Sequence, residues 1–346
     1  MIVIGVDAHK LTHTLVAVDA NGRIIGERVV EARPSGHSEA IGWARASYGG
    51  DVTWGVEDCR QVSAGLERAL LAEGEKVLRV PTVMMKRTRG AARTPGKSDS
   101  LDAAAVARAV LRERWLPPAS YDAASEELKL LVDRRDDLVD QRTATINRLR
   151  WRVHDLDPER APTRRAFRFA VQRDALFNWL ANQHSLSAEI ARDELEDITR
   201  LAESIASLEK RICALVAVAA PALVELPGCG ELTAAKIVAE TGGIHRFRSE
   251  AAFARICGVA PIPASSANSG RLRSKKYGNR KLNAALHIVA TTQIRLDCAG
   301  RTYYQKRRTA GDKPSKALRA LKRRLARVIY QRLQSQARSA SLVVPG

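Results

Sequence analysis

Two aspartates, Asp99 and Asp102, stand three residues apart at the start of an Ala-rich run. Alanine is the strongest helix former and Ser98 is a good N-cap residue, so we expect a helix to begin here. Residues i and i+3 share one face of a helix, so both carboxylates would point the same way and repel. A divalent cation with oxygen ligands would offset that repulsion. Acids in a first helical turn also interact favourably with the helix dipole, so this pair alone leaves a metal-free interpretation open.

The chain before these acids predicts three antiparallel strands and then alternating helices and strands. Asn21-Gly22 is a strong hairpin signal between the second and third strands. The expected elements are strands at 2–7, 12–18 and 23–30, a helix at 38–46, a strand at 52–56, a helix at 64–72 and a strand at 76–80. This order is typical of the ribonuclease H-like fold, in which acids at the ends of adjacent strands and on a late helix converge on one metal site.

Two further acids stand at such strand ends. The first apolar run ends in Asp7, and the run at 52–56 is followed by Glu57. Asp58 adjoins Glu57, but neighbouring residues of a strand point to opposite faces, so only one of the pair can easily face the site, and we choose Glu57. Four acids in these places predict one divalent-metal site with Mg²⁺ as the expected ion. Its ligands would be Asp7, Glu57, Asp99 and Asp102.

After Pro117-Pro118 the pattern changes to long amphipathic helices. Leucine, isoleucine and valine recur at helical spacing over 128–156 and again over 186–215, amid many charges. An Arg-rich span at 157–184 separates the two segments. The helices either pack on each other as a hairpin or pair with another subunit, and the sequence does not decide between these arrangements.

The charge is large and uneven along the chain. The net charge is +19, and the five cysteines are scattered without a Cys-x-x-Cys pair, so neither a zinc site nor a disulfide framework is indicated. Residues 1–60 carry 6 basic and 8 acidic side chains, whereas 271–328 carry 18 basic and 2 acidic. This balance points to a polyanionic partner, most plausibly nucleic acid. There is no apolar run of membrane-spanning length, and we expect a cytoplasmic protein.

The last third combines a Gly-bracketed turn, a serine-rich loop and a basic stretch. Residues 226–240 resemble a helix-hairpin-helix module, whose backbone amides can meet a phosphate. The loop at 257–270 is rich in Pro and Ser, and a helix is expected from about residue 282. Hydroxyls followed at once by cations make a phosphate-handling site plausible, although most loop serines are merely solvated. The expected nucleic-acid-binding residues are Arg271, Arg273, Lys275, Lys276, Asn279, Arg280 and Lys281.

These motifs resemble those of insertion-sequence transposases that pair an N-terminal DEDD, RuvC-like domain with a C-terminal serine-bearing domain, the bridge-RNA-guided recombinases. The resemblance covers nearly the whole chain. It rests on Gly5-Val-Asp7, Gly55-Val-Glu57, Lys97-Ser-Asp-Ser-Leu-Asp-Ala103, Leu226-Pro-Gly-Cys-Gly230, Gly258-Val-Ala-Pro261 and Gly278-Asn-Arg280. It implies that the four acids are the DEDD residues and that Ser266, five residues after Pro261, is the nucleophile.

One departure from the family pattern concerns this serine. In the family it is usually followed by Gly, whereas Ala267 follows Ser266 here, and Ser269-Gly270 restores the dipeptide three residues later. The distance onward to Gly278 favours Ser266, and Ser269 stays an alternative.

The resemblance also implies the architecture and the partners. We expect a RuvC-like domain at 1–116, a helical coiled-coil arm at 117–218, a mostly helical transposase domain at 219–335 and a flexible tail at 336–346. DNA and a noncoding guide RNA would be the partners of a dimer or tetramer formed through the arm. Cleavage would form a serine–phosphate link to DNA. Two other readings remain: a RuvC-type nuclease that activates water, and a non-catalytic nucleic-acid-binding protein.

Overall fold

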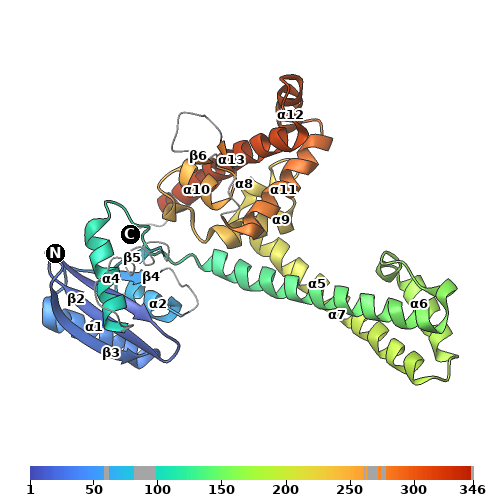
Figure 1. Ribbon diagram of the computed structural model, residues 1–346, viewed down its shortest axis with the longest axis horizontal. Coiled ribbons are helices and arrows are strands. Elements are labelled where there is room, and N and C mark those ends of the chain that lie inside the picture. Colours follow the sequence, from blue (N-terminus) through green and yellow to red (C-terminus); the bar gives the residue numbers. More distant parts are fainter. Residues whose placement is uncertain (58–61, 82–98, 261, 264–271, 274–277, 344–346) are drawn as a thin grey trace. The chain divides into compact units, whose positions relative to one another are not determined.

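The computed structural model describes residues 1–57, 62–81, 99–260, 262–263, 272–273 and 278–343, and gives only the backbone of 262–263, 272–273 and 340–343. The chain forms two compact units (Figure 1). The first comprises Met1–Tyr121 with His245–Ser249, and the second comprises Asp122–Ile244 with Glu250–Gly346. Within the described residues, no helix is both long enough and apolar enough to span a membrane.

The first unit contains a five-stranded mixed sheet. Its strands are β1 (Ile2–Ala8), β2 (Thr12–Val18), β3 (Ile24–Glu31), β4 (Val52–Glu57) and β5 (Lys76–Val80). They lie in the order β3-β2-β1-β4-β5, with β2 antiparallel to both β1 and β3 and with β4 parallel to both β1 and β5. The predicted order of elements is thus confirmed, including the turn at Gly22, whose φ of 77° suits glycine.

Helices cover both faces of this sheet. The helices α1 (Pro34–Tyr48) and α2 (Ala64–Ala72) share a buried cluster with Ile4 and Val6 of β1 and Trp54 of β4. Helix α4 (Asp99–Arg112) packs on the opposite face in a separate cluster that includes Val3 of β1. Because side chains alternate along a strand, odd-numbered positions of β1 face α4 and even-numbered positions face α1 and α2.

The first unit extends to Tyr121, a few residues past the boundary that we expected at residue 116. Residues 117–119 run along the free edge of β5, where Arg79 N–H donates to Pro117 O at 2.8 Å and Ala119 N–H donates to Val77 O at 2.9 Å. These hydrogen bonds keep the Pro117-Pro118 segment in the first unit, and the long helix starts only after Asp122, which caps it.

In the second unit, two 34-residue helices form an antiparallel hairpin. Helix α5 (Ala123–Leu156) packs along α7 (Leu186–Ala219), as Figure 1 shows. Arg135 near the start of α5 pairs with Glu209 near the end of α7 at 2.6 Å, and Arg148 and Arg152 both pair with Glu194 at 3.1 Å. Of the two arrangements that the sequence left open, the chain therefore adopts the intramolecular hairpin.

The far end of this hairpin is more ordered than the sequence predicts. The Arg-rich span contains two 3₁₀ turns, Pro158–Arg160 and Ala166–Arg168, and helix α6 (Ala170–Ala181). Phe167 and Leu180 are buried against α5 and α7 in a small core at this end. The weak periodicity of α6 gave no clear sequence signal, because most of its apolar side chains stay partly exposed.

The rest of the second unit is mostly helical. Its helices are α8 (Pro221–Val224), α9 (Glu231–Thr241), α10 (Glu250–Ile256), α11 (Arg280–Arg295), α12 (Ala299–Thr309) and α13 (Pro314–Val343). A two-residue β-ladder joins β6 (Ile262–Pro263) to β7 (Leu272–Arg273). Helix α13 continues to Val343 and so includes most of the stretch from residue 336 that we expected to be a flexible tail.

Candidate functional site

Asp7 and Glu57 stand at equivalent ends of two neighbouring parallel strands. The register pairs Val6 of β1 with Val56 of β4, so each acid is the next residue on its strand. Val56 belongs to the cluster on the α1 and α2 face, and alternation therefore directs Glu57 to the other face, where α4 lies. Asp7 shares this face, because it is an odd-numbered residue of β1.

Two glycines let α4 approach the sheet beside these acids. A Cβ on Gly5 would lie 2.0 Å from the backbone oxygen of Ala103, and one on Gly55 would lie 2.6 Å from a methyl carbon of Val110. Both contacts are far shorter than van der Waals distance, so any side chain at Gly5 would push α4 away from β1. Helix α4, which packs closely on β1 in this way, begins at Asp99.

The close packing brings Asp7 and Asp99 together with a histidine that the sequence analysis did not select. His9 Nε2 lies 3.1 Å from Asp7 Oδ2 and 3.5 Å from Asp99 Oδ1. One potential ligand atom from each of the three residues lies within 4.8 Å of the other two. We call Asp7, His9 and Asp99 the acidic cluster. His9 stands two residues after Asp7, and that i, i+2 spacing on an extended segment was the available signal.

The electrostatics of the acidic cluster favour a bound cation. Burial raises the pKa of Asp7 above its usual value, and repulsion from Asp102 and Asp99 raises it further, while the charge and hydrogen bond of His9 act in the opposite direction. A nearby positive charge would stabilise the ionised form of Asp7 and remove the repulsion. Crowded carboxylates are the ligands that hard divalent ions prefer, and an imidazole nitrogen is acceptable to Mn²⁺ more readily than to Mg²⁺.

The two remaining predicted acids lie close to this cluster without joining its tightest group. Asp102 is only 8% exposed on α4 and acts electrostatically on Asp7. Glu57 is partly buried at the end of β4. Among the described residues, the group whose ligand atoms lie within 4.8 Å of one another holds neither of them. Asp58 and Ser98, the expected N-cap residue, lie outside the described residues.

The predicted serine nucleophile also lies outside the described residues, as do Ser269, Arg271, Lys275 and Lys276. Arg273 is described only through its backbone, in β7. Asn279 is the N-cap of α11, and its Oδ1 accepts from Leu282 N–H at 2.9 Å. Arg280 is exposed, and Lys281 Nζ lies 2.6 Å from Asp133 Oδ1 on α5.

The residues that flank the serine-bearing segment lie against each other. Asn279 N–H donates to Ile256 O at 2.7 Å, and Asn283 Nδ2 donates to Cys257 O at 2.6 Å. Gly278 has a φ of 129° and approaches Gly258 so closely that a Cβ on Gly278 would lie 2.8 Å from Gly258 N. We call residues 256–258 and 278–279 the neck. Both ends of the segment that contains Ser266 are thus held together.

Comparisons with known proteins match both halves of the chain. A family model described as "Transposase" (DEDD_Tnp_IS110) matches residues 4–155, and one described as "Transposase IS116/IS110/IS902 family" matches residues 220–305. The chain is 28% identical to the insertion element IS900 uncharacterized 42 kDa protein of Mycobacterium paratuberculosis, over 96% of each chain. It is 26% identical to the IS116 uncharacterized 44.8 kDa protein of Streptomyces clavuligerus, over 96% of this chain and 94% of the relative.

A comparison of structures aligns 31% of this chain with 90% of T. thermophilus RuvC, solved in complex with a Holliday junction substrate, at 19% identity and a TM-score of 0.24. The two family models describe the same kind of transposase, and together they span more than half of the sequence. The chain belongs to the IS110/IS116 family of insertion-sequence transposases.

Proposed function

We propose that this chain is a DNA transposase that cuts and rejoins DNA for its insertion sequence through a covalent link to Ser266. The observation that carries the proposal is the acidic cluster at the junction of β1 and α4, in a chain whose two halves match transposase families. A positively charged C-terminal region supplies the matching surface for a polyanionic substrate.

Asp7, Glu57, Asp99 and Asp102 would hold a divalent metal, with Mg²⁺ as the first candidate and His9 beside it. These residues suit a divalent metal because Asp99 and Asp102 act electrostatically on Asp7, and Asp7 is largely buried. A bound divalent cation offsets negative charge on a phosphate and lowers the pKa of a nearby hydroxyl.

The covalent step exchanges one phosphorus–oxygen bond for another. Ser266 loses its hydroxyl proton to a base and its Oγ forms a bond to phosphorus. The phosphorus–oxygen bond to the adjoining nucleotide breaks, and the departing oxygen takes up a proton. Rejoining reverses these changes with a hydroxyl from another DNA end, so the phosphodiester is conserved without a further energy source. A serine hydroxyl is a weak nucleophile at neutral pH, so the step needs activation of Ser266.

The finer features of the proposal come from the family resemblance. A noncoding guide RNA would read donor and target DNA by base pairing, and the acidic site of one subunit would meet the serine of another. The α5–α7 hairpin offers a long helical surface for a dimer or tetramer. Phosphates near the serine would be neutralised by cations among Arg271, Arg273, Lys275, Lys276 and Arg280.

The experiment that tests the proposal traps the covalent protein–DNA link. Wild-type protein, with its copurified RNA and a divalent metal, is incubated with labelled DNA and the linked peptide is identified by mass spectrometry. We expect the link on Ser266, its loss in Ser266→Ala, and at most a partial reduction in the control variants Ser269→Ala and Ser265→Ala. Misplacing a nucleophile by about 1 Å costs on the order of 100-fold, so neighbouring serines should not substitute for each other.

Two other outcomes have distinct meanings. A link on Ser269 would move the nucleophile and keep the mechanism. DNA cleavage that persists without a link on any serine would replace the mechanism with hydrolysis by activated water at the acidic cluster.

A further inference from the structure

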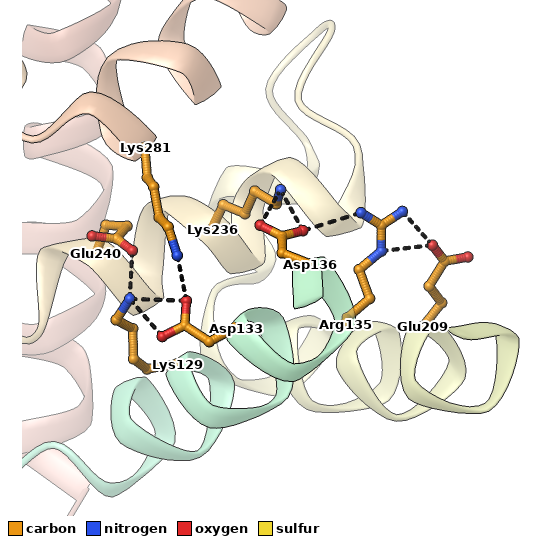
Figure 2. Close-up of polar contacts among 8 residues, drawn as sticks. All are labelled: Lys129, Asp133, Arg135, Asp136, Glu209, Lys236, Glu240 and Lys281. Atoms are coloured by element: carbon orange, nitrogen blue, oxygen red, sulfur yellow. Dashed lines mark hydrogen bonds and ion pairs between the residues drawn. The ribbon is translucent and has the colours of Figure 1, made fainter. Parts of the chain in front are cut away.

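A network of charged side chains joins three helices of the second unit around the neck. Figure 2 shows carboxylates and cations from α5, α9 and α11, with one further pair reaching α7. Lys236 of α9 contacts both carboxylate oxygens of Asp136 on α5, at 2.9 and 2.8 Å. The network therefore fixes α9 against α5 with charge-assisted hydrogen bonds, which are stronger than neutral ones.

Glu240, in the last turn of α9, has a different contact on each carboxylate oxygen. Its Oε1 lies 2.7 Å from Lys129 Nζ on α5 (Figure 2), and its Oε2 accepts a hydrogen bond from Asn279 Nδ2 at the neck. Glu240 is only 8% exposed. An unpaired charge at such a site is costly, so Glu240 requires both partners to stay in place.

Asn279 carries this interaction into the neck. Its Nδ2 reaches Glu240 while its Oδ1 caps α11 through Leu282 N–H, and its own backbone N–H bonds Ile256 O. One side chain therefore fixes where α11 starts relative to the end of α10. Ser266 lies between these two points in the sequence.

A second bridge runs parallel to the first. Lys281, two residues after Asn279, contacts Asp133 Oδ1 at 2.6 Å, and Asp133 also contacts Lys129 at 2.8 Å. Burial alone would raise the pKa of Asp133, but the hydrogen bonds and charges of Lys129 and Lys281 outweigh it and lower that pKa. Asp133 therefore stays ionised and keeps both cations in position near neutral pH.

We propose that Glu240 is a positioning residue for the covalent step: through Asn279 it fixes the neck, and through Lys129 it ties the neck to the α5–α7 hairpin. This inference rests on the proposed function of the serine segment. The same contacts remove Asn279 and Lys281 from the set of residues expected to bind phosphate, because their polar side-chain atoms already contact Glu240 and Asp133.

The test uses full-length protein and the rate of covalent adduct formation on labelled DNA. Asn279→Asp keeps a side-chain oxygen for the α11 cap, since aspartate caps as well as asparagine, but it removes the donor to Glu240 and opposes two carboxylates. We expect the adduct rate to fall by about 10- to 100-fold. DNA affinity should change little, whereas the melting temperature should fall, because two carboxylates then face each other at a buried site. Combining Asn279→Asp with Glu240→Gln restores a donor–acceptor pair and should recover most of the rate.

A matched control separates positioning from general stability. Glu209→Gln removes another carboxylate that pairs with a basic residue of α5, Arg135, but it has no contact with the neck. We expect Glu209→Gln to form the adduct at the wild-type rate. The inference is overturned if Asn279→Asp reacts within about twofold of wild type, if the double variant does not recover, or if Glu209→Gln is as slow. A wild-type protein that cleaves DNA without any adduct would overturn the proposed function itself, and this inference with it.

Discussion

The acidic cluster of the first unit and the neck of the second prepare reactive groups in contrasting ways. Asp7 and Asp99 come to their places through regular elements, because a strand end and a helix start meet where Gly5 lets α4 approach β1. The neck instead joins the end of α10 to the start of α11, which are the described residues on either side of Ser266 in the sequence. Its key contact, from Asn279 to Glu240, joins residues 39 positions apart.

This difference has consequences for what each region tolerates. The acidic cluster depends on backbone geometry, so it should be sensitive to added volume at the β1–α4 contact and to any loss of a carboxylate. The neck depends on ion pairs between distant helices, such as Lys129 with Glu240, separated by 111 positions. Polar substitutions that exchange partners should be tolerated there.

The largest effect is expected from removal of a carboxylate at the acidic cluster. Asp7→Asn and Asp99→Ala should each reduce DNA cleavage by more than about 100-fold, because a hard cation then loses an oxygen ligand. Removing a residue that merely hydrogen-bonds to a metal ligand already costs about 10- to 100-fold, so losing the ligand itself should cost more. Cleavage is measured on labelled DNA with Mg²⁺ or Mn²⁺ as the only metal, and Mn²⁺ binding is measured directly by calorimetry.

The matched control for these variants is Glu39→Gln. Glu39 is an acid of the same unit, on helix α1, which covers the face of the sheet opposite α4. Its exposed carboxylate pairs with Arg28 at 2.7 Å. It should leave both cleavage and Mn²⁺ binding unchanged. Wild-type cleavage by either cluster variant, with Mg²⁺ as the only metal, would contradict the assignment of these acids.

The sequence predicted the first unit well because its signals are local. The bounds of α2 and β5 agree with the structure residue by residue, since a short apolar run and its breakers define each element. We expected Asp7 and Asp99 to converge because the order of strands and helices is typical of the ribonuclease H-like fold. His9 was not selected, although it stands two residues after Asp7, because only the fold places it between two carboxylates.

The second unit was predicted in outline and missed in its polar detail. Periodic leucines identified α5 and α7, but the choice of the hairpin needed the contacts themselves. Glu240 looked like any acid near the end of a helix, because its partners Lys129 and Asn279 are remote in sequence. The continuation of α13 past residue 336 was missed because its small and polar residues give a weak apolar period.

A smaller effect, on stability, is expected from volume added at the β1–α4 contact. Gly5→Ala should lower the free energy of unfolding of the first unit by about 3 kcal/mol, because the new methyl group would overlap the backbone of α4 and force the helix outward. Mn²⁺ binding should weaken as well, since Asp99 moves with the helix. Thermal unfolding and calorimetry measure the two effects.

Gly42→Ala is the matched control for that substitution. Gly42 lies in α1, and a Cβ there would meet nothing within 4 Å. Alanine in a helix interior is favoured over glycine by roughly 0.5–1 kcal/mol, so this variant should be slightly more stable. A Gly5→Ala protein that unfolds like wild type and binds Mn²⁺ equally well would show that the close approach of α4 does not set the cluster.

The smallest effect distinguishes two neighbouring cations beside the neck. Arg280 is exposed and has no acidic partner among the described residues, whereas Lys281 pairs with Asp133 at 2.6 Å. Each phosphate neutralised on duplex DNA contributes roughly −0.9 to the slope of log K against log salt. Arg280→Gln should therefore make the slope shallower by about 0.9. Lys281→Gln should leave the slope nearly unchanged, because its ammonium group is already held by a carboxylate.

Filter binding from low to moderate salt measures both slopes. Equal changes in the two variants would mean that Lys281 exchanges Asp133 for a phosphate when DNA binds, and the second bridge to α5 would then open on DNA binding.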